Sequence, residues 1–272
     1  VEVRGALPAE VTCPETKVAF RTGDDGGTTG KRGNFVCAAC GKEQDIQAST
    51  KAFGRCAPFA AYALQGYCPQ CDRSGEGYGG RFFAAASDSS AFDRAMAEWF
   101  ELRDGAFRGC WPRQAIEVGD EIGPHDVYGH GLSHWWMLFN ARQLLVHVHL
   151  LSAIAKCGTV EWSSREFVLG AFQQYLRNQN MFCFWNIQAD KMEPMLSESR
   201  FQPKSSVIEN SVFGCLGRGN WVSSAESLAE GIEWAQNPWD TVSNAVLAEA
   251  RADLVAEQSG KSTKVNPGDG LT

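Results

Sequence analysis

The sequence predicts an α+β fold in which a zinc-ribbon-like, β-rich lobe is followed by a mainly helical lobe. Two Cys-x2-Cys pairs lie in the first part of the chain, and apolar residues recur at helical spacing in the second. With 272 residues, 44% of them hydrophobic, the chain can bury a substantial core. We place the β-rich lobe at residues 1–110 and the helical lobe at residues 111–272. Because the first residue is Val1 rather than Met, we expect a fragment of a longer chain.

The cysteine pairs are the strongest local signal. Cys37 and Cys40 are followed by Gly41, which suits a left-handed turn, and Cys68 and Cys71 come after a 27-residue gap. Each pair places two thiolates on one tight turn, and two such turns complete the tetrahedral S4 shell that zinc prefers. We therefore predict a structural Zn²⁺ ion held by Cys37, Cys40, Cys68 and Cys71. Ordinary buried cysteines or a redox-active Cys-x2-Cys pair are the alternatives.

Short strands are expected to lead into these turns. Aromatic residues, Phe35 and Tyr67, stand just before the two pairs, and residues 81–84 form a further strand candidate. Cys13 with Pro14 resembles half of a zinc knuckle, but Thr16 stands where the second cysteine would be. The Gly-rich stretch from Thr22 to Gly33 lacks a phosphate-binding pattern and is predicted to be a hairpin tip.

Helices are predicted mainly from apolar spacing and capping residues. Asn140 is a suitable N-cap for a largely apolar helix that Gly158 ends, and Ser163 with Glu166, like Ser223 with Glu226, forms a capping-box pattern. Whether Met181 to Trp185 is helix or strand stays open. The expected helices cover Ser90–Leu102, Asn140–Lys156, Phe167–Asn178, Ser223–Trp234 and Asp240–Glu257, with one strand at Lys261–Val265.

Charge leaves the partner open. The chain carries a formal charge of −7, but residues 1–82 hold 10 Lys and Arg against 9 Asp and Glu, whereas the remainder holds 15 against 23. No apolar run approaches the length of a membrane span, so we expect no membrane partner. Four of the ten cysteines have zinc-type spacing and no signal peptide opens the sequence, so we expect a cytoplasmic location.

Two further groups of polar residues are candidates for a site. His125, His130 and His134 fall in one short window, but Gly131 disfavours the helix that a metal-binding His pair would need. Arg142 and Gln143 lie near the start of an otherwise apolar helix, where a cation has no favourable interaction with the helix dipole. They could contact a nucleic acid or a substrate, or Arg142 could form an internal ion pair.

The chain resembles the middle, zinc-containing insertion region of large adenine-specific DNA methylase-like proteins that carry an N-terminal domain of unknown function. The segment Leu138 to Leu145, with Arg142 and Gln143, is similar to the family's F-x-P-R-Q-L-L motif. The other segments occur in the family's order: Val11–Pro14, Gly33–Gly41, Gly80–Phe83, Trp185–Asn186, Glu209–Phe213 and Gly219–Trp221. Each motif is short, so the specificity lies in their order over residues 10–225.

The resemblance implies an accessory or target-recognition region of an S-adenosylmethionine-dependent DNA methyltransferase. The family's cofactor-binding and catalytic motifs do not occur here, so the chain is expected not to be catalytic alone and S-adenosylmethionine to bind only to the intact parent. Expected partners are DNA and the remaining methylase domains, with contacts through Arg142, Gln143, Lys31 and Arg32. The alternatives are a zinc-ribbon module for protein–protein contact and a zinc enzyme that uses the three histidines.

Overall fold

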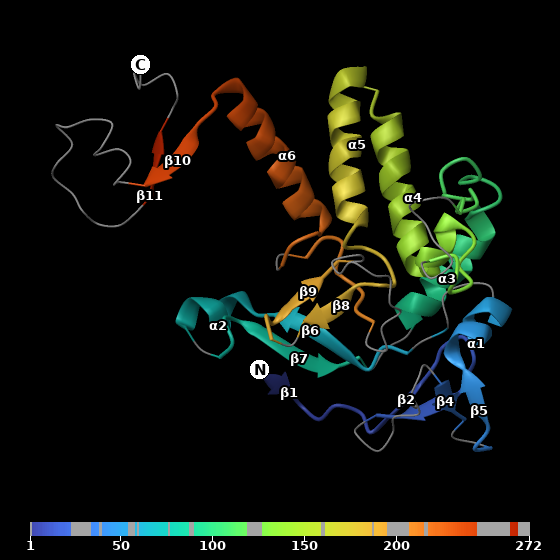
Figure 1. Cartoon of the computed structure of the whole chain (residues 1–272). Helices are drawn as coiled ribbons and strands as arrows, with labels where there is room; N and C mark the ends of the chain where they lie inside the picture. The colour runs from blue at the N-terminus through green and yellow to red at the C-terminus, as the bar shows by residue number, and fades with distance from the viewer. Residues whose placement is uncertain are drawn as a thin grey trace.

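The computed structural model shows a mixed α+β chain whose described residues form six α-helices and several small β-sheets (Figure 1). The α+β prediction is therefore confirmed at this level. The structure describes residues 2–22, 34–37, 40–53, 58, 60–75, 77–86, 90–118, 127–158, 161–186, 188–194, 207–214, 217–243 and 262–265.

A three-stranded sheet lies near the start of the chain, with the order β1-β7-β6. Its strands are β1 (Val3–Arg4), β6 (Ala63–Tyr67) and β7 (Arg81–Ala85). β6 and β7 are antiparallel, whereas β1 adds in parallel at the edge. The ring of Phe82 lies directly over Gly66, where a side chain would have no room, and the Arg4 guanidinium stacks on the same ring at 4.0 Å. These contacts fix the edge strand against the sheet.

Four two-stranded antiparallel sheets complete the described β-structure. They are β2 (Glu10–Thr12) with β3 (Ala19–Arg21), β4 (Asn34–Val36) with β5 (Glu43–Asp45), β8 (Phe184–Asn186) with β9 (Lys191–Glu193), and β10 (Asp240–Ser243) with β11 (Ser262–Val265). The strands predicted around Phe35 and Tyr67 and at residues 81–84 are confirmed. Of the stretch Met181–Trp185, whose type was left open, only Phe184 and Trp185 are in a strand, β8. The strand predicted at residues 261–265 is also confirmed by β11.

The helix predicted to start at Asp240 is wrong at its beginning. Residues Asp240 to Ser243 form β10, whose register pairs Asp240 with Val265 of β11. The β-branched residues Thr241 and Val242 favour an extended strand once a partner strand is present. The remainder of the predicted helix, residues 244–257, lies outside the described residues.

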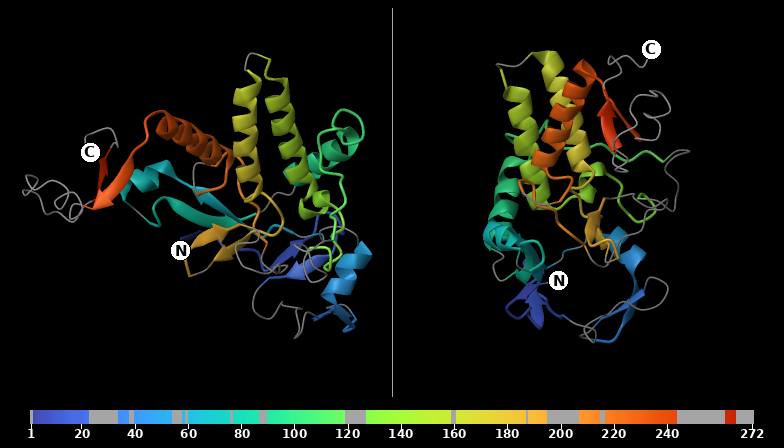
Figure 2. Two further views of the ribbon diagram at one scale, coloured as in Figure 1. Left: turned by 45° about the horizontal axis from the view of Figure 1, so that its top comes forward. Right: turned by 90° about the vertical axis from the view of Figure 1, so that its left-hand side faces the viewer.

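The helices are α1 (Ile46–Phe53), α2 (Pro69–Ser74), α3 (Ser90–Leu102), α4 (Ala141–Lys156), α5 (Trp162–Leu176) and α6 (Trp221–Gln236), with a 3-10 turn η2 at Trp135–Leu138. α4 and α5 stand side by side, and α6 leans away from them (Figures 1 and 2). α3 packs against α4 and α6 packs against α5. α3 lies within the predicted β-rich lobe, residues 1–110, and α4 lies within the predicted helical lobe. The packing of α3 against α4 is therefore a contact between these two predicted lobes.

Capping explains where these helices begin. The prediction for Asn140 is confirmed, because its side chain accepts a hydrogen bond from the Gln143 N–H at 2.8 Å. The predicted capping box at Ser163 is wrong: α5 already begins at Trp162, whose indole N–H donates to Glu166 at 2.9 Å. The box at Ser223 is likewise displaced, because Asn220 caps α6 and accepts from the Ser223 N–H at 2.8 Å.

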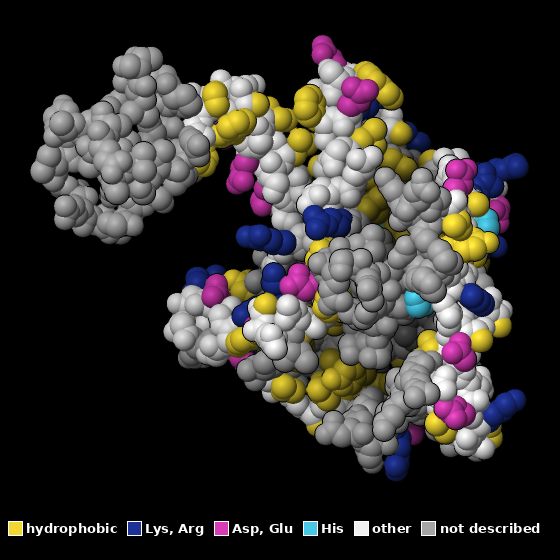
Figure 3. Space-filling model, in the orientation of Figure 1, with side chains coloured by type: hydrophobic (Ala, Val, Ile, Leu, Met, Phe, Trp, Pro, Cys, Tyr) yellow, Lys and Arg dark blue, Asp and Glu magenta, His cyan; other side chains and the backbone are white. Residues whose placement is uncertain are grey.

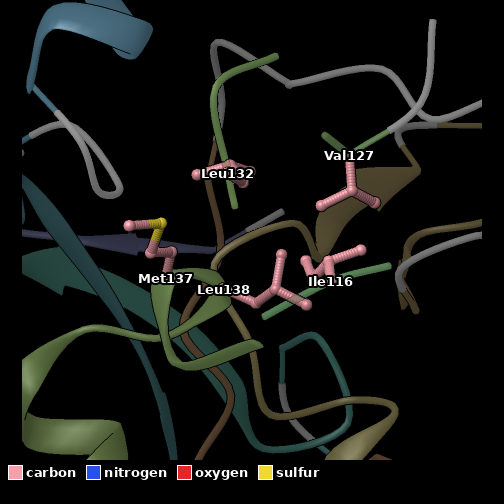
Figure 4. Packing of buried hydrophobic residues seen from close by; sticks show 5 residues of the cluster. All are labelled: Ile116, Val127, Leu132, Met137 and Leu138. Atoms are coloured by element: carbon pink, nitrogen blue, oxygen red, sulfur yellow. The ribbon is translucent and has the colours of Figure 1, made fainter. Parts of the chain in front are cut away.

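Among the described residues, the buried hydrophobic side chains form three clusters. The first lies under the 3-10 turn and is formed by Ile116, Val127, Leu132, Met137 and Leu138 (Figure 4). The second joins Trp99 of α3 to Leu144, Leu145 and Val148 of α4, and the third joins Ile154 of α4 to Phe172 and Tyr175 of α5. α4 contributes to two clusters, which agrees with its expected central position.

Apolar side chains remain exposed along α5 and α6, where they gather in the upper part of Figure 3. They include Trp162, Phe167, Val222, Ile232 and Trp234. Among the described residues, none of the helices combines the length and the apolar character that crossing a lipid bilayer requires.

Candidate functional site

The first cysteine pair lies at the tip of the β4–β5 hairpin. The Cys37 N–H donates to the Lys42 carbonyl at 2.9 Å, and the Gly41 N–H donates to the Cys37 carbonyl at 2.8 Å. Gly41 has a φ of 70°, as expected for the residue after a knuckle, since glycine adopts this conformation without steric cost. The backbone at Cys37 and Cys40 therefore has the turn that the sequence predicted.

The β2–β3 hairpin repeats this turn at Cys13. The Cys13 N–H donates to the Val18 carbonyl at 2.8 Å, the Lys17 N–H donates to the Cys13 carbonyl at 2.9 Å, and Lys17 has a φ of 59°. Cys13 thus corresponds to Cys37 and Lys17 to Gly41, while Thr16 takes the place of Cys40. Sequence reasoning did not assign Cys13 to the site, although the Cys-Pro dipeptide was the available signal.

The second pair, Cys68 and Cys71, is built differently. Cys68 is the N-cap of α2, and its sulfur accepts the Cys71 N–H at 3.5 Å. The guanidinium of Arg4 donates to the Cys71 sulfur at 3.2 Å. Hydrogen bonds from the backbone N–H and side chain of Cys71 lower the pKa of Cys68 to about 7, and the hydrogen bond to Cys68 raises the pKa of Cys71.

The two cysteine pairs do not come together. Figure 1 places α2 at one side of the molecule and the β4–β5 hairpin at the other. Across the described ranges, there is no group of three or more His, Cys, Asp or Glu side chains positioned to hold a metal ion. Cys37, Cys40, Cys68 and Cys71 therefore do not fit a single tetrahedral zinc shell in this arrangement, because α2 is anchored to the β6–β7 sheet.

The histidine window forms no metal cluster within the described part of the chain. The ring Nδ1 of His134 lies 2.9 Å from the Ser133 hydroxyl, and His134 immediately precedes the 3-10 turn. His125 lies outside the described residues. His130 and His134 thus gain no support as ligands of a catalytic zinc ion.

Arg142 forms the internal ion pair that the sequence left as one of its alternatives. Its Nε donates to Glu209 Oε1 at 2.8 Å, and its Nη2 lies 2.7 Å from Glu209 Oε2. The Asn140 amide also donates to Glu209 Oε2, at 3.1 Å. The side chain of Glu209 is 18% exposed, and the hydrogen bonds and charge of Glu209 raise the pKa of Arg142. This network ties the start of α4 to the segment 207–214.

Gln143 is unsuited to contact a nucleic acid directly in this structure. It is 3% exposed, and its side-chain oxygen accepts the Asn140 N–H at 3.1 Å, so the two residues form a reciprocal capping box. The proposed contact through Gln143 thus finds no support in its position. Lys31 and Arg32, the other predicted contacts, lie outside the described residues.

The same face of α4 carries a buried histidine, His147. His147 is 5% exposed; its Nε2–H donates to the Gln179 carbonyl at 2.9 Å, and its Nδ1 accepts the Tyr175 hydroxyl at 3.0 Å. Burial lowers the pKa of His147 to about 4, so the ring is neutral at pH 7. Burial, and secondarily the Glu209 charge, raises the pKa of Tyr175.

Gln179 continues this network toward α6. Its amide donates to the Gly219 carbonyl at 3.0 Å and to the Ser211 carbonyl at 3.4 Å, and Gln179 itself is fully buried. The network therefore joins α4, α5 and the two segments around Glu209 and Gly219 into one polar centre.

The comparisons with known proteins identify no relative: the chain matches no protein-family model, no curated protein and no solved structure.

Proposed function

We propose that the chain is a zinc-stabilised accessory or target-recognition region of an S-adenosylmethionine-dependent DNA adenine methyltransferase and is not catalytic alone. On this proposal its partners are DNA and the remaining methylase domains, in a reducing, cytoplasmic setting. The resemblance described above is the origin of the proposal. The observation that supports it most is how the segments that carry the resemblance lie in the fold.

Three of these segments are far apart in sequence but meet in the polar centre. Leu138–Leu145 supplies Asn140 and Arg142, which bind Glu209 of the segment Glu209–Phe213. The third segment, Gly219–Trp221, joins through the Gly219 carbonyl and through the Trp221 N–H, which donates to Val212 at 2.8 Å. These three segments, which carry the resemblance, are therefore also in contact in the fold, as a shared structural role requires.

The matching turns at Cys13 and at Cys37 support a zinc role for the two hairpins. Thiolates of Cys13, Cys37 and Cys40 are preferred zinc ligands, whereas the Thr16 hydroxyl is not. Across the described residues these three side chains do not already form a group that could hold a metal ion. The binding free energy of a structural zinc ion contributes to folding, so on this proposal the ion itself draws the two hairpins together. The fourth ligand then comes from outside the two turns.

Zinc content tests this ligand set. The 272-residue chain is expected to retain about one zinc ion after dialysis, as structural sites do, measured by inductively coupled plasma mass spectrometry. Cys37→Ser, Cys40→Ser and Cys13→Ser should each lose the metal, whereas Cys68→Ser and Cys71→Ser should keep it. Loss of zinc in all variants except Cys13→Ser would instead support the four-cysteine site predicted from sequence. A metal-free wild-type chain would contradict a zinc role altogether.

DNA binding is expected to depend on Lys31 and Arg32 rather than on Arg142, whose guanidinium is bound to Glu209. The double variant Lys31→Gln/Arg32→Gln should weaken duplex binding in fluorescence anisotropy. It should also lower the slope of log K against log salt by about 1.8, since each phosphate contact contributes about 0.9. The charge-matched control Lys156→Gln/Arg108→Gln changes two exposed cations elsewhere and should leave both quantities unchanged.

Two outcomes would contradict the DNA-facing role. Binding that the control variant weakens as much as the test variant would indicate nonspecific attraction. If the chain shifts no DNA even at low salt but retains zinc, the alternative of a zinc-ribbon module for protein–protein contact is favoured, in agreement with the exposed apolar side chains of α5 and α6. Calorimetry should show no binding of S-adenosylmethionine to the chain by itself.

A further inference from the structure

The Cys68–Cys71 pair has its own surroundings, away from the hairpin cysteines. Its cation, Arg4, comes from β1, and the same guanidinium is held by Glu2 at 2.6 Å and by the face of Phe82. The Cys68 sulfur accepts the Cys71 N–H at 3.5 Å, and both thiols are partly exposed. The pair therefore combines two thiols on one helical turn, a fixed positive charge and access to small molecules.

We propose that Cys68 and Cys71 form a dithiol–disulfide couple that exchanges with low-molecular-weight disulfides, independently of any metal bound by the hairpins. The Cα atoms of residues three apart in a helical turn lie about 5 Å apart, within the Cα–Cα range of about 4.4–6.8 Å that a disulfide spans. Arg4 stabilises negative charge on the sulfur atoms, and thiolates rather than thiols carry out the exchange. In a reducing compartment the dithiol is the resting form.

The exchange proceeds in two balanced steps. The Cys68 thiolate attacks one sulfur of the small disulfide RSSR, which breaks its S–S bond and releases RS⁻, and a mixed disulfide remains on Cys68. The sulfur of Cys71 then attacks the Cys68 sulfur, forms the Cys68–Cys71 bond and releases the second RS⁻. The two protons of the protein thiols end on the two RSH molecules. The protein dithiol is oxidised and RSSR is reduced.

Equilibration with oxidised and reduced glutathione tests the proposal. After quenching with N-ethylmaleimide and digestion, peptide mass spectrometry should find Cys68 and Cys71 unlabelled and joined to each other, and the bond should disappear on reduction. Trypsin leaves Cys56 on the same peptide, so a Cys56→Ser background keeps the assignment unique. Arg4→Gln should slow the oxidation roughly threefold, because a unit charge near the sulfur favours the thiolate.

The double variant Cys37→Ser/Cys40→Ser serves as the control and should leave the midpoint of the couple unchanged. This variant removes two proposed zinc ligands but neither thiol of the couple. Failure of the redox proposal can therefore be distinguished from failure of the zinc proposal. The proposal is overturned if Cys68 and Cys71 stay fully labelled in oxidised glutathione, or if either joins a hairpin cysteine instead. It is also overturned if the pair is protected by a zinc ion that Cys68→Ser removes.

Discussion

Replacing Glu209 with alanine is expected to lower the free energy of unfolding by about 3 kcal/mol, the lower end of the range for breaking a largely buried ion pair. The carboxylate receives two contacts from Arg142 and one from Asn140, and its side chain is only 18% exposed. Removing it leaves the guanidinium without this acceptor and leaves the amide with the weaker Met181 sulfur, at 3.2 Å. Because the Arg142 side chain is 39% exposed, water compensates part of the loss. Urea denaturation followed by circular dichroism measures the change.

Glu98→Ala is the matched control. Glu98 also pairs with a side chain of α4, His149, at 3.3 Å, but the two side chains are 49% and 55% exposed. Exposed pairs contribute about 0.5 kcal/mol or less, so this variant should be close to wild type. Equal effects of the two substitutions would show that the Glu209 network does not hold the segment 207–214 against α4. A double-mutant cycle with Arg142→Met should give a clear coupling energy for the Arg142–Glu209 pair only.

Features with a local cause could be predicted from sequence. The helix Ser90–Leu102 follows from its apolar spacing, and the Asn140 cap and the left-handed Gly41 follow from the chemistry of single residues. Such signals act over a few positions, so they do not depend on the rest of the fold. The capping boxes at Ser163 and Ser223 were predicted wrongly, because α5 already begins at Trp162 and because Asn220 rather than Ser223 caps α6.

Features that depend on distant partners could not be predicted in this way. Arg142 and Glu209 are 67 residues apart, and no local pattern indicates that they meet. The spacing of the cysteine pairs likewise predicts a knuckle at each pair but does not say which knuckles face each other. The likeness of the Cys13 and Cys37 turns lies in the backbone, in Lys17 and Gly41 at positive φ, and a lysine there carries no sequence signal. The strand at Asp240 also depends on β11, which pairs with it.

A loss of stability below neutral pH is expected from His147. Its pKa is about 4 in the folded chain because of burial, against 6.5 for an unperturbed histidine. The unfolded chain therefore binds the proton first as the pH falls, and protonation favours unfolding. The stabilising contribution is complete above pH 6.5 and is lost between pH 6.5 and pH 4. A difference of this size corresponds to about 3 kcal/mol.

The measurement is the free energy of unfolding by urea at several pH values between 4 and 7, compared between wild type and His147→Gln. The variant should be less stable at pH 7, because the Gln179 carbonyl and the Tyr175 hydroxyl lose their partner, yet its stability should fall less steeply with acid. Carboxylates titrate in both proteins, so the difference between the two curves isolates the histidine. His149→Gln, at an exposed position of the same helix, is the matched substitution. Parallel curves for wild type and His147→Gln would mean that His147 has the same pKa in the folded and the unfolded chain, which would contradict a pKa lowered by burial.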